Sequence, residues 1–315
     1  MSGADGAVGR LPAGHRLDGL LLAEKGSGVT SFHVVTHLRR VLRVPKVGHG
    51  GTLDPMATGV LPILLGVATK LAPYVQAVDK EYVATMRLGV TTDTLDATGR
   101  VIAERPVPPL DADAIRAALA RFEGEIEQVP PMFSAIHAGG RRLHELARAG
   151  IEVPRAPRRV RIDALELLAW APPLLTARIA CGKGTYVRSL AADLGHVLGC
   201  GARLEALRRT RLGSFSVNEA VPWSVIREGD ATILRSRVLP PDRAVGHLPS
   251  VRLDDVAAHR VQSGQRLAAP AQGVAGVCRL YAADAFLGIG EASADGLRAL
   301  RLLYATLPRT RPVSC

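Results

Sequence analysis

Cysteine is scarce in this chain, and its placement excludes two kinds of protein. The 315 residues include 4 cysteines, Cys181, Cys200, Cys278 and Cys315, which show no CxxC spacing and no paired histidines. A structural zinc site needs clustered ligands, and a disulfide framework is typical of short, cysteine-rich chains. The sequence therefore predicts neither a metal centre nor a fold held together by disulfides.

Long apolar runs and targeting signals are also missing. The longest apolar run, GVLPILLGVA at 59–68, is interrupted by Pro62 and is too short to span a bilayer. The first residues, MSGADGAVGRLPAG, lack the basic-then-apolar pattern of a signal peptide. We therefore expect a cytoplasmic protein without a membrane anchor, in which residues 1–15 form a flexible tail.

Lysine is rare, although the chain is strongly basic. It occurs only at positions 25, 46, 70, 80 and 183, so arginine supplies most of a formal net charge of +11. A charge of this size favours a polyanionic partner, above all a nucleic acid. Arginine suits bidentate phosphate contacts, but its excess can equally mirror genomic base composition, so only the net charge supports this interpretation.

Helical and strand-like patterns alternate along the chain and predict a mixed α/β fold. Apolar residues make up 47% of the sequence, which is enough for a packed core. We expect strands at 17–25, 80–90, 158–170 and 174–187, and helices at 30–42, 59–76, 111–124 and 187–199. The segment LEALRRTRLGSF at 204–215 is expected to form a basic turn.

A change of composition separates a C-terminal unit. The stretch VLPPDRAVGHLPS at 238–250 is rich in proline and predicts a linker. Short strand-like runs separated by glycine and aspartate follow it. This pattern predicts a small all-β module of about sixty residues, within the usual size range of domains.

The stretch GHGGTLDPMATG at 48–59 places one carboxylate, Asp54, among glycines and small or apolar residues. By itself, Asp54 before Pro55 is a helix N-cap pattern. His49 by itself is more typical of a structural or surface histidine. GKGT at 182–185 lacks the GxxxxGK[ST] pattern, so we exclude a nucleoside triphosphate site.

Four motifs that occur in order change this interpretation. They are GHGGTLDPMATGVLPI, KEYVATMRLG, GKGTYVRSLAADLG and RRTRLGSF. Together they resemble the TruB family of tRNA pseudouridine synthases, over about residues 17 to 218. The resemblance implies an α+β pseudouridine synthase fold with a central, largely antiparallel sheet in residues 16–245, and a small PUA-like RNA-binding β-barrel in residues 249–310.

The resemblance also implies an isomerase that needs no cofactor and no metal. Such an enzyme detaches the uracil of the T-loop uridine at tRNA position 55, rotates it and rejoins it through C5. Asp54 matches the nucleophile, Arg188 matches its ion-pair partner, and Tyr82 matches the tyrosine that stacks on the base and transfers a proton at C5. A carboxylate in a nearly dry pocket needs such a cation, because desolvation raises a carboxyl pKa. Whether Asp54 attacks C1′ or C6, or assists glycal formation, stays open.

Substrate contacts follow from the same resemblance. His49 matches a histidine that meets the extruded uridine. Lys25 lies in EKGSGVTS, which is similar to the family pattern DKPxGxTS, and we expect it to support the active-site loop. Glu24 and Gly26 depart from that pattern, so the turn is expected to be less rigid. The other expected contacts are Gly51, Thr52, Lys183, Tyr186, Arg141, Arg142, Arg208, Arg209 and Arg211.

Residues 130–154 match a mobile segment that closes over tRNA, although His137 and His144 replace the family's lysine and tyrosine. For Arg141, Arg142 and Arg148, solvated helix charge is an equally good interpretation. We expect a monomer that binds the T-arm of tRNA without an obligatory protein partner.

Two other functions are compatible with the motifs. One is the catalytic subunit of a guide-RNA ribonucleoprotein, against which the uninterrupted segment 130–150 and the lack of a long basic tail argue. The other is a tRNA-folding chaperone, in which Asp54 would be dispensable.

Overall fold

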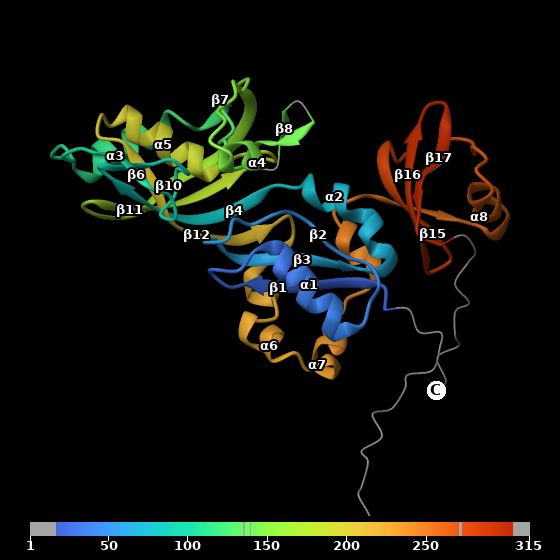
Figure 1. Cartoon of the computed structure of the whole chain (residues 1–315). Helices are drawn as coiled ribbons and strands as arrows, with labels where there is room; N and C mark the ends of the chain where they lie inside the picture. Colours follow the sequence, from blue (N-terminus) through green and yellow to red (C-terminus); the bar gives the residue numbers. More distant parts are fainter. Residues whose placement is uncertain (1–16, 135, 139, 271–272, 305–315) are drawn as a thin grey trace, which may run out of the picture.

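The protein has a large α/β part and a smaller C-terminal unit, which lie side by side (Figure 1). The structure is a computed structural model that describes residues 17–134, 136–138, 140–270 and 273–304. The predicted tail at 1–15 and the last residues of the predicted C-terminal domain lie outside these ranges. No helix in the described ranges is long and apolar enough to cross a membrane.

A nine-stranded sheet forms the centre of the larger part. Its main order is β1-β3-β12-β4-β11-β10-β7, with β2 added to β3 and β13 to β12. All its pairs are antiparallel except the short contact of β12 with β3, which confirms the expected, largely antiparallel sheet. The strands are β1 (Gly19–Lys25), β2 (Val47–His49), β3 (Thr58–Leu65), β4 (Lys80–Leu88), β7 (Gly124–Gln128), β10 (Arg158–Ala171), β11 (Leu174–Cys181), β12 (Ala202–Leu212) and β13 (Phe215–Ser216).

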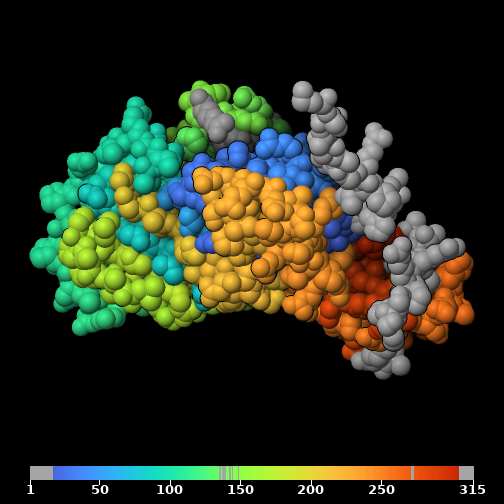
Figure 2. All heavy atoms as spheres, turned by 90° about the horizontal axis from the view of Figure 1, so that it is seen from below, coloured from blue at the N-terminus to red at the C-terminus, as the bar shows by residue number. Residues whose placement is uncertain are grey.

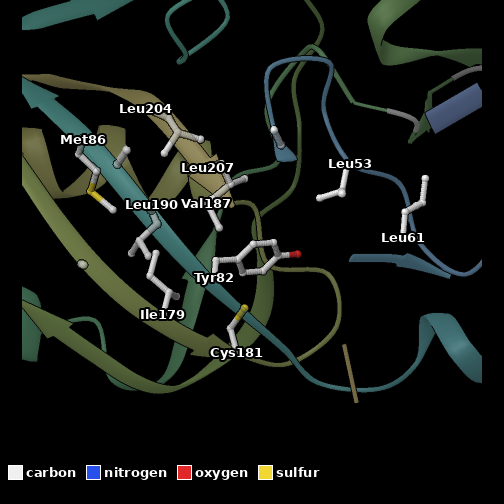
Figure 3. Packing of buried hydrophobic residues seen from close by; sticks show 14 of the residues in the cluster. Leu53, Leu61, Tyr82, Met86, Ile179, Cys181, Val187, Leu190, Leu204 and Leu207 are labelled. Atoms are coloured by element: carbon white, nitrogen blue, oxygen red, sulfur yellow. The ribbon is translucent and has the colours of Figure 1, made fainter. Parts of the chain in front are cut away.

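Helices cover the two ends of this sheet (Figure 1). Near β1 and β2 lie α1 (Ser31–Leu42), α6 (Trp223–Glu228) and α7 (Ala231–Ser236), whereas α3 (Ala112–Ala120) and α5 (Val187–Val197) pack on β10 and β12. The main apolar core lies between these layers and the sheet. Figure 3 shows part of this core, in which side chains of β4, β11, β12 and α5 meet.

The predicted helix at 59–76 is wrong in its first half. Residues Thr58–Leu65 form β3, which is followed by a 3₁₀ helix at Gly66–Leu71 and by α2 (Ala72–Gln76). A continuous apolar run has no period that separates a buried helix from a strand buried on both faces. The strand ends at Leu65. The next residue, Gly66, has a φ of +58°, and a Cβ there would lie 1.9 Å from Asp18 Oδ1, so a side chain does not fit.

The predicted clamp segment, residues 130–154, projects from the edge of the larger part (Figure 1). It contains a hairpin of β8 (His137–Ala138) and β9 (Arg141–Arg142), followed by α4 (Leu143–Arg148). A second hairpin, β5 (Val90–Thr92) with β6 (Val101–Glu104), follows β4.

The C-terminal unit is a four-stranded sheet in the order β14-β15-β16-β17, with one helix against it. Its elements are β14 (Ser250–Leu253), α8 (Asp255–Gln262), β15 (Gly276–Ala282), β16 (Ala285–Ser293) and β17 (Gly296–Leu302). A small sheet domain was predicted, but within the described ranges the strands form an open sheet and not the closed barrel that the resemblance implied. The outer strands are β14 and β17, and Leu297 of β17 also pairs with Leu267 through an isolated antiparallel bridge. The unit has its own apolar cluster.

The two parts share an apolar interface. Side chains of β1, β3 and the 3₁₀ helix at Pro241–Val245 form one cluster with Ile289 and Leu303 of the C-terminal unit. Lys70 Nζ donates to the backbone oxygens of Leu302 and Leu303 at 2.9 and 3.0 Å. Figure 2 shows the C-terminal unit, orange to red, packed directly against the gold segment that precedes it.

Candidate active site

Asp54 lies in the loop between β2 and β3, at the start of a tight turn. The N–H of Ala57 donates to the backbone oxygen of Asp54 at 3.0 Å, and β3 begins at Thr58. No helix follows, so the helix-cap interpretation of Asp54 is wrong. The loop is tied to α1, because Ser31 Oγ accepts from the N–H of Leu53 and donates to its oxygen at 2.9 and 3.0 Å.

Arg188, in the first turn of α5, grips the carboxylate of Asp54 with two hydrogen bonds. Its Nε donates to Asp54 Oδ2 at 2.8 Å and its Nη2 to Oδ1 at 3.1 Å. The Arg188 side chain is 5% exposed, whereas that of Asp54 is 31% exposed. A charged acid is thus held by a buried, permanent cation while part of it still faces outward.

The remaining donors of Arg188 bind two other segments. Nη1 donates to the oxygen of Thr94 at 3.1 Å, and Nη2 to that of Phe133, in the clamp segment, at 2.8 Å. Three stretches that are far apart in sequence therefore meet at one guanidinium.

A second, buried carboxylate stands next to the pair, and the motifs did not indicate it. Asp96 Oδ2 lies 3.8 Å from Arg188 Nε. Asp96 Oδ1 accepts from Thr94 Oγ1, Thr98 Oγ1 and the N–H of Thr98 at 2.6 to 2.9 Å. The only sequence signal was an aspartate surrounded by threonines in a polar loop, TTDTLDATG.

Tyr82 lies on β4 at the edge of the main core and is 7% exposed. Its phenol oxygen is directed toward the side of the loop that carries Leu53, and its ring lies near Cys181 (Figure 3). Burial raises the pKa of Tyr82, and the nearby Arg209 opposes this shift. The phenol is therefore neutral at physiological pH.

Arg209 lies neither in a turn nor at the surface, so two predictions are wrong: that residues 204–215 form a basic turn and that Arg209 contacts phosphate. It lies in strand β12, opposite Tyr82, and is 1% exposed. Its guanidinium donates to the backbone oxygens of Val60 at 2.9 Å, Gly51 at 3.0 Å and Thr52 at 3.4 Å. Its donors hold the Asp54 loop on the sheet and do not face solvent, so Arg209 is not available to a phosphate.

His49 is the last residue of β2, and Gly51 and Thr52 follow it in the loop that carries Asp54. Gly51 N–H donates to His49 Nδ1 at 3.4 Å, and Thr52 is exposed. Burial, and secondarily Arg209, lowers the pKa of His49, which favours a neutral imidazole. Gly51 has a φ of +145°, which a residue with a side chain rarely adopts.

Lys25 is fully buried and, as expected, supports the loop that carries Asp54. Its Nζ donates to the oxygens of Gly26, Val29 and Pro55 at 2.9, 2.7 and 3.0 Å. Burial lowers its pKa to about 8, although Asp54 opposes the shift. The structure also explains why glycine replaces the family's proline, since a Cβ at Gly26 would lie 2.6 Å from Cδ1 of Trp223.

The other predicted cationic contacts differ in their exposure. Arg208 and Arg211 are 46% and 44% exposed, and Arg208 forms an ion pair of 2.7 Å with Glu24. Lys183 is exposed in the turn before α5, and Arg141 is exposed on the clamp hairpin. The side chains of His137, Arg142, His144 and Arg148 lie outside the described part of the structure.

Tyr186 is the N-cap residue of α5, and its backbone is bound by the amide of Gln128. Its N–H donates to Gln128 Oε1 at 2.8 Å, and Gln128 Nε2 donates to its oxygen at 3.1 Å. Ser189 Oγ donates to the oxygen of Val129 at 2.9 Å. The root of the clamp segment is thus bound to the first turn of the helix that carries Arg188.

Among the described residues, no group of three or more histidine, cysteine or acidic side chains could hold a metal ion.

Three family profiles match the chain in succession. Residues 39–187 match the TruB family pseudouridylate synthase (N terminal domain), and 188–246 match the tRNA pseudouridylate synthase B C-terminal domain. Residues 249–303 match Pseudouridine synthase II TruB, C-terminal.

Curated relatives match over nearly their whole length. A tRNA pseudouridine synthase B of Aromatoleum aromaticum is 49% identical over 92% of this chain and 94% of its own. The protein of the same name from Chromohalobacter salexigens is 44% identical over 95% and 98%.

Two solved structures share the fold of this chain. A Cbf5-Nop10-Gar1 complex superposes with a TM-score of 0.71 and 27% identity, over 91% of this chain and 85% of that one. An H/ACA RNP bound to a substrate RNA containing 2′-deoxyuridine gives 0.69 and 26%, over 91% and 86%. With the site geometry above, these matches show that the chain belongs to the TruB family of pseudouridine synthases.

Proposed function

We propose that this protein converts the T-loop uridine at position 55 of tRNA to pseudouridine, with Asp54 as the nucleophile. The observation that carries the proposal is the bidentate pair of Asp54 with the buried Arg188. Tyr82 is near enough for the charge of Asp54 to act on its phenol. The tRNA pseudouridine synthase B name of its full-length relatives supports the choice of substrate.

The pair provides what a carboxylate nucleophile needs. Arg188 binds both oxygens of Asp54 through charge-assisted hydrogen bonds and so holds the carboxylate in one orientation. The partly exposed carboxylate is the part that would meet the ribose or base of the uridine. The reaction breaks the N1–C1′ bond, forms the C5–C1′ bond and moves the C5 proton to N1, so no redox partner is needed.

Tyr82 supplies an aromatic face and a neutral hydroxyl. Stacking of a base on such a ring contributes about 1–3 kcal/mol and tolerates any base. Because its raised pKa keeps the phenol protonated, Tyr82 would act in proton transfer at C5 through its hydroxyl and not as a preformed phenolate.

The target uridine would have to leave the stack of the T-loop to reach Asp54. His49, on the rim of the Asp54 loop, would contact the extruded nucleotide. Recognition would otherwise rest on the RNA backbone, through Lys183, Tyr186, Arg141, Arg142, Arg208 and Arg211.

The catalytic subunit of a guide-RNA ribonucleoprotein is the second candidate. One solved structure of similar fold is titled an H/ACA RNP bound to a substrate RNA, which favours this candidate. The relatives at 44% and 49% identity are named tRNA pseudouridine synthase B, which favours the single enzyme. A non-catalytic tRNA-folding chaperone is the third, and in it Asp54 would not be needed.

One experiment separates the three. Purified wild type and Asp54→Asn are incubated with an unmodified tRNA transcript, without guide RNA, and pseudouridine is mapped by sequence position. We expect product at position 55 with wild type alone. Equal rates from both proteins would eliminate the nucleophile assignment, and wild-type activity only after addition of guide RNA would favour the ribonucleoprotein.

A further inference from the structure

Arg209 is a buried cation without a carboxylate partner. It is 1% exposed, and its guanidinium donates to three backbone oxygens of the segment 51–60. Arg188, in contrast, has the carboxylates of Asp54 and Asp96 beside it. In the described part of the chain, no acidic side chain forms an ion pair with Arg209, so its charge has no fixed counter-charge there.

This unpaired charge is costly to the fold. A charge that leaves water loses much of its solvation, and backbone dipoles replace it only in part. A buried lysine can reduce the cost by releasing its proton, as the lowered pKa of Lys25, about 8, indicates. Burial also lowers the pKa of Arg209, but a guanidinium keeps its proton. Fixed charges of this kind stabilise negative charge that develops during a reaction, which suggests a purpose for Arg209.

The phenol of Tyr82 lies where this charge can act. Arg209 of β12 and Tyr82 of β4 are direct partners in the register of the two strands. The phenol oxygen is directed toward the side of the loop that carries Leu53 (Figure 3). Arg209 donates to the oxygens of Gly51 and Thr52 in the same loop. The guanidinium and the phenol oxygen therefore approach one short stretch of backbone from adjacent strands.

The electrostatic surroundings of the phenol agree with this geometry. Burial raises the pKa of Tyr82, and Arg209 is the strongest influence that lowers it. Cys181 of β11 and Asp54 of the loop both act to raise it. Without Arg209, these surroundings would only disfavour negative charge on the phenol oxygen.

We propose that Arg209 is a positioning residue for Tyr82, whose guanidinium stabilises negative charge on the phenol oxygen while that oxygen transfers the C5 proton. The phenol oxygen takes the proton of C5 while its own proton passes through water to N1. The electrons of the C5–H bond form the C5=C6 double bond, and those of the C6=N1 double bond bind the proton at N1. Proton number and charge are therefore conserved. This inference rests on the proposed function and adds Arg209 to its proton transfer.

A titration of the phenol tests the proposal without turnover. 3,5-Difluorotyrosine, whose phenol ionises near neutral pH, is placed at position 82, and fluorine NMR follows its protonation. We expect Arg209→Gln to raise the pKa of this phenol by about one unit, and Arg209→Lys, which keeps the charge, to change it by less than about half a unit. Arg203→Gln is the control, because it removes an arginine of the same strand that has its own carboxylate partner, Glu205. It should leave the pKa unchanged.

The direction of the shift separates the charge of Arg209 from its packing. If Arg209 only held the loop in place, its loss would admit water to the phenol, and hydration lowers the pKa of a tyrosine. A lowered or unchanged pKa in Arg209→Gln would therefore overturn the proposal. If that variant does not fold, Arg209→Lys decides: a pKa close to that of wild type supports the proposal, and a lowered pKa contradicts it.

Transcripts with deuterium at C5 of the target uridine test the proton transfer itself. In Arg209→Gln, the single-turnover rate at saturating enzyme should fall about tenfold, the equivalent of one pKa unit, with the Kd for RNA within about twofold. A C5 deuterium isotope effect should accompany this loss, because the slowed step breaks the C5–H bond. Arg209→Lys should restore most of the rate. An unchanged rate in Arg209→Gln, or a slower rate without an isotope effect, would overturn the proposal.

The two measurements also keep this inference apart from the proposed function. If wild type makes no pseudouridine, the proposed function fails and this inference fails with it. An active wild type whose phenol does not respond to Arg209→Gln eliminates only the role of Arg209.

Discussion

At the scale of single residues, the hydrogen bonds of the Arg188 guanidinium hold the candidate active site together. Arg188 uses Nε and Nη2 in parallel on Asp54 and directs Nη1 to Thr94. A lysine would keep the charge but could not reproduce this planar fork. The function of Arg188 therefore depends on its shape as well as on its charge.

Arg188→Lys should accordingly lose activity while the protein stays folded. We expect kcat to fall about 100-fold, the usual effect of displacing a reacting group by about 1 Å, with a smaller change in KM. Single-turnover pseudouridine formation checks this. Arg178→Lys, which alters a half-buried ion pair with Glu81 and Glu166, is the matched control and should retain the wild-type rate. Equal rates for both variants would show that charge alone suffices at position 188.

Lys25 makes a pH-dependent contribution to stability. Its pKa is about 8 in the folded protein and 10.5 ordinarily, so between these values the unfolded chain holds a proton that the folded chain has lost. Stability therefore rises with pH across this window, by up to about 3 kcal/mol from this residue.

Lys25→Met should flatten that rise. Lys80, whose pKa is also lowered to about 8, keeps part of the slope in the variant. The measurement is the free energy of unfolding in urea at pH values of about 7.5, 9 and 10. Identical pH slopes in wild type and Lys25→Met would show that Lys25 does not titrate in this window.

At the scale of elements, the loop after β1 packs closely against helix α6, where Gly26 meets Trp223. Trp223 occupies the space that a side chain at position 26 would need. Gly26→Pro should therefore destabilise the protein by about 1–3 kcal/mol through overpacking. With Trp223→Ala the two losses should sum to more than the loss of the double variant, which a double-mutant cycle in urea measures. Strict additivity would remove steric conflict as the reason for the glycine.

The sequence was informative where a motif covers a whole element and weak where strands pair over long distances. The motifs predicted a site that contains Asp54, Tyr82 and Arg188, and the structure pairs Asp54 with Arg188 although they lie 134 residues apart. The role of Arg209 was mispredicted because Arg208, Arg209 and Arg211 look alike in the sequence. Only the register of β12 against β4 turns the side chain of Arg209 inward. Asp96 was missed because its partner lies in α5 and leaves no local trace.

At the scale of the whole molecule, the excess of positive charge should control RNA binding. Affinity should fall as salt rises, because each neutralised phosphate releases counterions. Arg208→Gln and Arg211→Gln should each reduce the slope of log K against log salt by about 1. A filter-binding series over salt concentration measures this, and unchanged slopes in both variants would place the RNA elsewhere.

Arg209→Gln should behave differently, although it lies beside Arg208. Its buried guanidinium holds three backbone oxygens, so the variant should lose about 1–3 kcal/mol of stability. Unfolding in urea, compared with Arg208→Gln as the exposed control, separates the two roles. A reduced salt slope with unchanged stability would contradict the burial of Arg209.

Three segments meet at Arg188, so the candidate active site is complete only in the folded chain. The oxygens of Thr94 and Phe133 and the carboxylate of Asp54 reach this side chain only after the loop, the clamp root and α5 have all docked. A chain that is still folding has the proposed nucleophile, Asp54, in its sequence but no guanidinium in place to orient it. On the proposed function, activity requires that all three segments have docked, so pseudouridine formation would report on the completed native state.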